Sequence, residues 1–201
     1  IVAIKVGRTE LAAKLAISHS GALAGSDASY QAVFEAYGVQ RVDDMAELTA
    51  ALILFSRLAP LTEGALVTLH DSGGERQLAI DLAEQFAVSL TEMAPNTIER
   101  LEQRLDPGLP AVNPLDAWGS GGAEAPDNMA QCFSALLRDP GAALGAVVHD
   151  RAPGGGIYPA YLEYLRVGGK ASGKPVCLVA NQQGSGSDPL VVAATREGLP
   201  V

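Results

Sequence analysis

Short apolar segments alternate with amphipathic ones along the chain, and this pattern predicts strands followed by helices. Residues 1–6 are apolar and β-branched, which is typical of a buried parallel strand. Residues 27–37 carry their large apolar side chains at helical spacing. The expected strands are residues 1–6, 39–42, 65–70, 88–90, 144–149 and 175–180. The expected helices are residues 9–16, 27–37, 43–58, 75–87, 95–105, 126–138, 157–171 and 188–197.

The alternation of strands with helices predicts an α/β fold with parallel, doubly wound sheets. The pattern breaks at residues 59–64 (Ala-Pro-Leu-Thr-Glu-Gly), which we interpret as a linker. The chain would then consist of one piece over residues 1–58 and a second over 65–201. The sequence starts inside a strand, without Met, and stops where a further strand begins at 198–201. We therefore expect a larger parent protein, truncated at both ends.

Composition narrows the class of protein. Apolar residues make up 48% of the chain and charged residues 18%, so a sizeable core can be buried. The formal net charge of −9 disfavours nucleic-acid binding, which relies on Lys and Arg. Cys132 and Cys177 fit neither a zinc site nor a redox pair, and we interpret them as buried free thiols. Without a signal peptide or an apolar run of about 20 residues, we expect a cytoplasmic protein that does not bind membranes.

A loop rich in small residues is predicted between Ser18 and Asp27. Its sequence, Ser-His-Ser-Gly-Ala-Leu-Ala-Gly-Ser-Asp, follows Lys-Val-Gly-Arg at residues 5–8. Together these residues resemble the phosphohistidine segment of the succinyl-CoA synthetase superfamily, which includes the ADP-forming acetyl-CoA synthetases. The resemblance covers residues 1–57 and implies that His19 is the catalytic residue that carries a phosphoryl group. It also implies phosphate binding by Ser18, Ser20 and Gly21.

A second segment, Val67–Gly74, ends in Asp-Ser-Gly-Gly, and Asn-Pro-Leu-Asp follows at 113–116. Both are similar to the flavodoxin-like CoA-ligase domain of the same superfamily, although Asp71 and Leu115 depart from its usual residues. The resemblance implies that Ser72, Gly73 and Gly74 open a helix whose N-terminus binds the phosphate on His19. A carboxylate at Asp71 would repel that phosphate unless it points away.

Asn113 and Asp116 lie in a segment, residues 106–125, that is predicted to be irregular. They either shape the active site or cap a turn. We interpret Trp118 as a packing residue, and His70 and His149 as structural residues at strand ends. A hydrolase triad of His70, Asp71 and Ser72 is excluded, because adjacent residues cannot line up as acid, base and nucleophile.

The resemblance implies a reversible reaction in which a carboxylic acid, CoA and ATP give acyl-CoA, ADP and phosphate. It implies no tightly bound cofactor and no metal site in this chain. ATP or ADP, Mg²⁺ and CoA would be substrates, held mainly by CoA-binding and ATP-grasp domains of the same protein or a partner subunit. A homo-oligomer, the acid and the choice of ADP or GDP stay open.

Two interpretations from other functional classes compete with that of a synthetase. One is a non-catalytic regulatory module, as in fusions of synthetase-like domains with protein acetyltransferases. The intact small-residue loop around His19 weighs against it. The other is a flavodoxin-like module that binds a nucleotide or flavin. The absence from the sequence of a phosphate loop with clustered Ser and Thr weighs against that reading.

Overall fold

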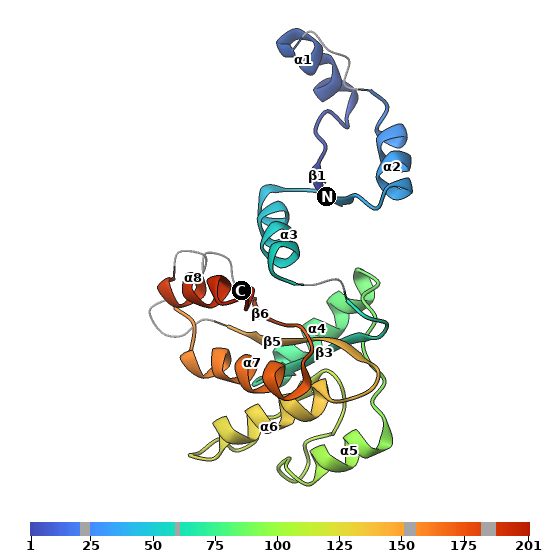
Figure 1. The fold of residues 1–201 in the computed structure, drawn as a ribbon. Helices are drawn as coiled ribbons and strands as arrows, with labels where there is room; N and C mark the ends of the chain where they lie inside the picture. The colour runs from blue at the N-terminus through green and yellow to red at the C-terminus, as the bar shows by residue number, and fades with distance from the viewer. Residues whose placement is uncertain (21–24, 59–60, 151–155, 182–187) are drawn as a thin grey trace. The chain divides into compact units, whose positions relative to one another are not determined.

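The computed structural model describes residues 1–20, 25–58, 61–150, 156–181 and 188–201, and it gives side chains for all of these except 18–20. The chain forms two compact units, Ile1–Ser56 and Arg57–Val201 (Figure 1). Both units contain parallel strands connected by helices, so the predicted α/β class is confirmed. Within the described residues, no helix is long and apolar enough to cross a membrane.

The first unit is a small parallel βα arrangement. Its elements are β1 (Val2–Ile4), α1 (Glu10–Ser20), α2 (Asp27–Ala36), β2 (Gln40–Val42) and α3 (Met45–Arg57). The two strands pair in parallel, with Val2 opposite Gln40 and Ile4 opposite Val42. Because parallel strands end at the same edge, the segments that follow β1 and β2 begin next to each other.

Helix α1 is longer than the sequence pattern predicts. It continues through Ser18, His19 and Ser20, so the prediction that a loop begins at Ser18 is wrong. Alanines 12, 13 and 16 favour a helix, and neither Pro nor Gly interrupts the sequence before Gly21. The backbone of His19 therefore belongs to the last turn of a helix.

The second unit is built around one four-stranded parallel sheet in the order β4-β3-β5-β6. Its strands are β3 (Ala65–His70), β4 (Leu115–Asp116), β5 (Ala142–His149) and β6 (Val176–Ala180). Its helices are α4 (Gly73–Gln85), α5 (Pro95–Glu102), α6 (Ala125–Leu137), α7 (Pro159–Ser172) and α8 (Pro189–Arg196). The backbone N–H of Leu178 donates to the carbonyl of Pro200, which brings the last described residues beside β6.

The two faces of this sheet are covered unequally. Val67, Leu69 and Val147 point to the face packed by α6 and α7, where the main core forms. Leu66 and Thr68 alternate with them and face α4 on the other side. Figure 1 shows α6 and α7 side by side against the strands. The core thus lies mainly between the sheet and this helix pair.

Two strand predictions change in the second unit. Residues 88–90 form no full strand, because only Leu90 makes an isolated parallel bridge to Leu66. Conversely, the segment predicted to be irregular contains β4, which pairs Leu115 with Leu69 and Asp116 with His70. A two-residue strand is too short to show an alternating pattern in the sequence.

Glycines allow α6, β5 and α7 to pack closely. A Cβ built on Gly168 in α7 would lie 2.6 Å from Phe133 Cδ1, and one on Gly145 in β5 would lie 2.5 Å from Leu137 Cδ2. Phe133 and Leu137 are fully buried in α6. The absence of side chains at both positions is therefore a packing requirement of the core.

We expect Gly168→Ala to lower the free energy of unfolding by about 1–3 kcal/mol, because overpacking outweighs the better helix propensity of Ala. Urea unfolding measures the difference. Lys170→Ala, an exposed position on the same helix, is the control and should change the stability little. Equal stability of Gly168→Ala and wild type would contradict the packing account.

Candidate functional site

The carboxyl edge of the second sheet brings several polar residues together. Strands β3 and β5 are parallel neighbours, so Asp71 and Asp150, which directly follow them, emerge at the same edge. The chain leaves β3 toward β4 on one side and returns to β5 on the other. Such a reversal opens a crevice where ligands bind in open α/β sheets. The sequence-predicted turn at Ser72–Gly74 lies at this crevice.

Helix α4 begins at this edge with an uncapped N-terminus. Ser72 has extended backbone angles (φ −142°, ψ 126°) and occupies the cap position, but its side chain makes no capping hydrogen bond. Gly73 and Gly74 are the first two helical residues. A Cβ on Gly74 would meet only Ser72 Oγ, at 3.7 Å. Free N–H groups, the positive end of the helix dipole and open space are the features of an anion site.

The carboxylate of Asp71 is held by α7. The hydroxyl of Tyr161 donates a hydrogen bond to Asp71 Oδ2, joining residues 90 positions apart in sequence. Burial, followed by this bond, raises the pKa of Tyr161, which therefore stays protonated and remains a donor. The positive end of the Tyr161 hydroxyl dipole lies against this carboxylate and offsets part of its field. The repulsion expected from a carboxylate before the glycine turn is reduced accordingly.

Glu75 is the third residue of α4, and the sequence analysis did not single it out. Its Oε1 accepts a hydrogen bond from Asn181, and its Oε2 is buried without a hydrogen-bond partner among the described residues. Burial, and then the negative charges of Asp71 and Asp150, raise the pKa of Glu75 to about 7. A large share of this carboxyl is thus protonated and uncharged at neutral pH.

The two histidines at the strand ends are buried. His70 Nε2 lies 2.9 Å from Thr68 Oγ1, and burial lowers the pKa of His70 to about 4. His149 donates from Nδ1 to the carbonyl of Asp150, and its ring stacks on Tyr161 with centroids 4.6 Å apart. Burial lowers the pKa of His149 as well. Both rings are neutral at pH 7 and supply no positive charge to the crevice.

The structure separates the two residues of the Asn-Pro-Leu-Asp segment. Asn113 accepts from the N–H of Thr68 at 2.9 Å and donates to the carbonyls of Leu66 and Thr91, so it joins β3 to the segment beside it. Asp116 instead lies at the crevice, where a Cβ on Gly73 would be 3.4 Å from its Oδ2. Asn113 thus supports the sheet, whereas Asp116 borders the N-terminus of α4.

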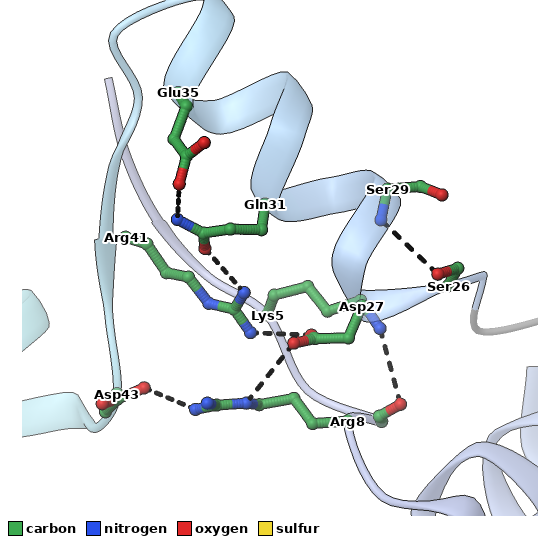
Figure 2. A network of polar contacts seen from close by, with 10 residues as sticks. Lys5, Arg8, Ser26, Asp27, Ser29, Gln31, Glu35, Arg41 and Asp43 are labelled. Carbon is green, nitrogen blue, oxygen red and sulfur yellow. Dashed lines mark hydrogen bonds and ion pairs between the residues drawn. The ribbon is translucent and has the colours of Figure 1, made fainter.

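The first unit holds the ends of its histidine-bearing segment with an ion-pair network (Figure 2). Asp27, at the start of α2, accepts from Arg41 at 2.7 Å and lies 3.9 Å from Arg8, which precedes α1. Arg8 also donates to Asp43 at 2.5 Å. The hydrogen bond from Arg41, followed by the charges of Arg41 and Arg8, lowers the pKa of Asp27. The network therefore joins residues that flank the segment from 9 to 26.

The predicted site residues of the first unit are only partly described. Ser18, His19 and Ser20 lie at the end of α1, and their side chains lie outside the described part of the chain, as does Gly21. The geometry around the His19 imidazole therefore stays a prediction from the sequence.

An aromatic cleft adjoins the α4 N-terminus, and sequence reasoning missed it. Its volume is about 360 Å³. Its lining residues are Asp71, Trp118, Pro126, Asp150, Tyr158, Ala160, Tyr161 and Tyr164. Trp118, interpreted from the sequence as a packing residue, keeps 38% of its surface exposed and forms one wall. The spacing of Tyr158, which caps α7, and of Tyr161 and Tyr164 within it was the only available signal, and such spacing usually marks a core face.

We expect Glu75→Gln to stabilise the chain at high pH. The raised pKa means that the contribution of Glu75 to stability is complete below its unfolded value of 4.5 and is lost as the pH rises through about 7. The variant should match wild type at pH 4 and exceed it by on the order of 1 kcal/mol at pH 8, a figure reduced for solvent screening of this partly exposed carboxyl. Urea unfolding at both pH values tests this, with the exposed Glu84→Gln as the control. A difference that does not change with pH would contradict it.

Asp27→Asn should loosen the start of α2, because the amide cannot pair with Arg41 and Arg8. The lowered pKa of Asp27 means that its contribution is present above 3.8 and is lost as the pH falls. Hydrogen exchange of residues 25–42, corrected for the intrinsic effect of pH, should be faster in the variant at pH 7. The difference should be smaller at pH 3, because the contribution of the carboxylate is lost as the pH falls below 3.8. Glu10→Gln, which breaks only the exposed pair with Lys14, should leave exchange in these residues unchanged at both pH values.

Comparisons with known proteins agree with this architecture. Residues 1–55 match the family model of the succinyl-CoA ligase like flavodoxin domain. An ADP-forming acetate–CoA ligase of Methanocaldococcus jannaschii is 36% identical over 119 residues, which are 59% of this chain and 17% of the relative. A trans-feruloyl-CoA synthase from an unknown prokaryotic organism is 27% identical over 204 residues, covering 100% of this chain and 26% of the relative.

A solved structure shows the same fold. The dinucleotide forming acetyl-coenzyme A synthetase 1 of Ca. Korarchaeum cryptofilum, in complex with phosphate and ADP, superimposes with a TM-score of 0.79 at 23% identity. The match covers 99% of this chain and 42% of that one. The chain spans about a sixth of the length of the first of these curated relatives and about a quarter of the second. Residues 1–55 thus match the succinyl-CoA ligase-like flavodoxin domain, and the chain is homologous to ADP-forming acetate–CoA ligases over part of their length.

Proposed function

We propose that the chain is a segment of a nucleoside-diphosphate-forming acyl-CoA synthetase in which His19 carries the phosphoryl group. The observation that carries this proposal is the open N-terminus of α4. It follows a parallel strand at the edge of the sheet where ligands gather, begins with two glycines, and lacks a side-chain cap. The homology to ADP-forming ligases supports the reaction class.

The proposed reaction moves one phosphoryl group through the histidine. An imidazole nitrogen of His19 attacks the γ-phosphorus of ATP, and ADP leaves. A carboxylate oxygen of the acid then attacks the phosphorus of phosphohistidine, which releases the imidazole and forms an acyl phosphate. The CoA thiolate attacks the acyl carbon, and inorganic phosphate leaves. Neutral imidazole serves both as nucleophile and as leaving group near pH 7.

In this proposal the N-terminus of α4 holds the phosphate during transfer. The N–H groups of Gly73 and Gly74 donate to phosphate oxygens, and the helix dipole adds positive potential. The negative charges of the surrounding carboxyl groups oppose phosphate binding, but the repulsion from two of these groups is reduced. Asp71 is hydrogen-bonded by Tyr161, and the pKa of Glu75 is raised to about 7. The protonated form of Glu75 therefore favours an anion at the helix end.

The remaining steps need other parts of the enzyme. We propose that CoA, ATP and Mg²⁺ bind mainly to CoA-binding and ATP-grasp domains of the same protein or a partner subunit. This chain by itself would then not turn over. The substrate is a carboxylic acid, and the names of the relatives show that acids as different as acetate and trans-ferulate are used by homologous proteins.

The test uses the full-length protein incubated with ATP labelled in its γ-phosphate and Mg²⁺. We expect an acid-labile, base-stable label on the peptide that contains His19, and no label in His19→Ala. Gly74→Asp should reduce the labelling at least tenfold, because a new carboxylate at the helix end repels phosphate.

Gly74→Asn is the matched neutral control and should retain the label. An acidic residue in the first turn favours the helix, so Gly74→Asp should fold at least as stably as Gly74→Asn. Absence of label in wild type would overturn the phosphohistidine proposal and favour a regulatory module. Equal labelling of the two Gly74 variants would show that α4 does not hold the phosphate.

A further inference from the structure

The cleft beside α4 is an unusual concentration of aromatic surface for this chain. Aromatic residues are only 5% of the sequence, yet Trp118, Tyr158, Tyr161 and Tyr164 all line this one cleft. Tyr161 and Tyr164 are almost completely buried, while Trp118 and Tyr158 each keep 38% of their surface exposed. The lining of the cleft thus combines two partly exposed rings with two buried ones.

The rings are held in a defined geometry by their neighbours. Tyr161 lies edge-on to Tyr158 at 5.4 Å and 90°, and to Tyr164 at 5.6 Å and 72°. Tyr161 itself is fixed by its hydrogen bond to Asp71 and by stacking on His149. Edge-to-face and stacked arrangements are the preferred geometries for an additional ring. The cleft is thus a preorganised wall for a flat aromatic ligand.

The described charged groups of the cleft are both carboxylates and disfavour an anionic group beside them. Among the described residues that line it, the charged ones are Asp71 and Asp150. Asp71 accepts from Tyr161, whereas the carboxylate of Asp150 has no hydrogen bond or ion pair within the described residues. An unpaired carboxylate favours a hydroxyl donor from a ligand. The phosphates of a nucleotide or of CoA would be repelled here.

On these grounds we propose that the cleft binds the ring of an aromatic carboxylic acid that bears a ring hydroxyl. The ring packs against Trp118 and Tyr158, and its hydroxyl donates to Asp150. The carboxylate of the acid points out of the cleft toward the N-terminus of α4, where the helix dipole favours negative charge. This inference rests on the proposed function and names the substrate class of that site.

The size of the cleft agrees with such a ligand. A volume of about 360 Å³ lies at the lower end of the range for small-molecule sites, roughly 300–1,000 Å³. A short aliphatic acid such as acetate would leave the aromatic walls uncovered. Burial of a ring removes far more apolar surface from water and contributes correspondingly more to binding.

Binding can be measured without catalysis, because Trp118 is the single tryptophan of this chain. We expect 4-hydroxycinnamate to change the fluorescence of Trp118 in the 201-residue chain, and acetate to cause no change. Cinnamate, which lacks the hydroxyl, should bind about tenfold more weakly, as is typical for the loss of a hydrogen bond to a charged group. Asp150→Asn should reduce that tenfold difference, while the exposed Phe86→Ala, outside the cleft, should not.

The full-length protein supplies the second readout, as acyl-CoA formation from the same acids. Tyr158→Ala should raise KM for 4-hydroxycinnamate at least tenfold, whereas the control Phe86→Ala should not change it. Labelled His19 with no binding of either aromatic acid would overturn this inference and leave the proposed function standing. Binding of aromatic acids without labelling of His19 and without acyl-CoA formation would support the cleft as a binding site and overturn the proposed function. A fluorescence response to ATP or CoA that competes with 4-hydroxycinnamate would identify a nucleotide site and overturn the inference.

Discussion

The parallel pairing of β3 with β5 is the constraint on which the site of the second unit depends. It places two strand ends side by side at one edge, so that α4 and α7 start from neighbouring positions. Tyr161 of α7 can then donate to Asp71, which precedes α4. That bond spans the crevice between the two connections. The bond holds the ring of Tyr161 in place. It also engages one oxygen of the Asp71 carboxylate next to the N-terminus of α4, where we propose that an anion binds.

The electrostatics of this edge divide it into two parts. At the N-terminus of α4, free N–H groups and the helix dipole favour a phosphate or carboxylate. In the adjoining cleft, Asp71 and Asp150 favour a donor and repel an anion. Glu75, in the first turn of α4, can change its charge close to neutral pH, because its pKa is raised to about 7. A ligand with an acid at one end and a hydroxyl on a ring at the other matches this division.

Much of the fold follows from local sequence. The short apolar segments that form β1, β3, β5 and β6 are evident from the sequence, and the Ser-Gly-Gly turn marks the start of α4. The two-residue strand β4 and the extension of α1 through His19 are decided by tertiary pairing and by the lack of a helix breaker, which short patterns do not report.

The site was predictable only where its residues are contiguous. Ser72, Gly73 and Gly74 could be placed at the start of a helix because one motif contains them all, and their binding of phosphate stays a prediction. Glu75 and the tyrosines of α7 acquire their properties from neighbours far away in sequence, such as Asn181 for Glu75 and Asp71 for Tyr161. Burial and charge from distant segments set their pKa values, and no local pattern carries that information.

The most direct measurement of the central claim is a crystal structure of the full-length protein trapped with phosphate on His19. The account predicts that phosphate oxygens lie at hydrogen-bond distance, about 3 Å, from the backbone nitrogens of Gly73 and Gly74. It also predicts that Asp71 remains bonded to Tyr161. A phosphohistidine whose oxygens are bound entirely by other groups, with the N-terminus of α4 facing water, would contradict it.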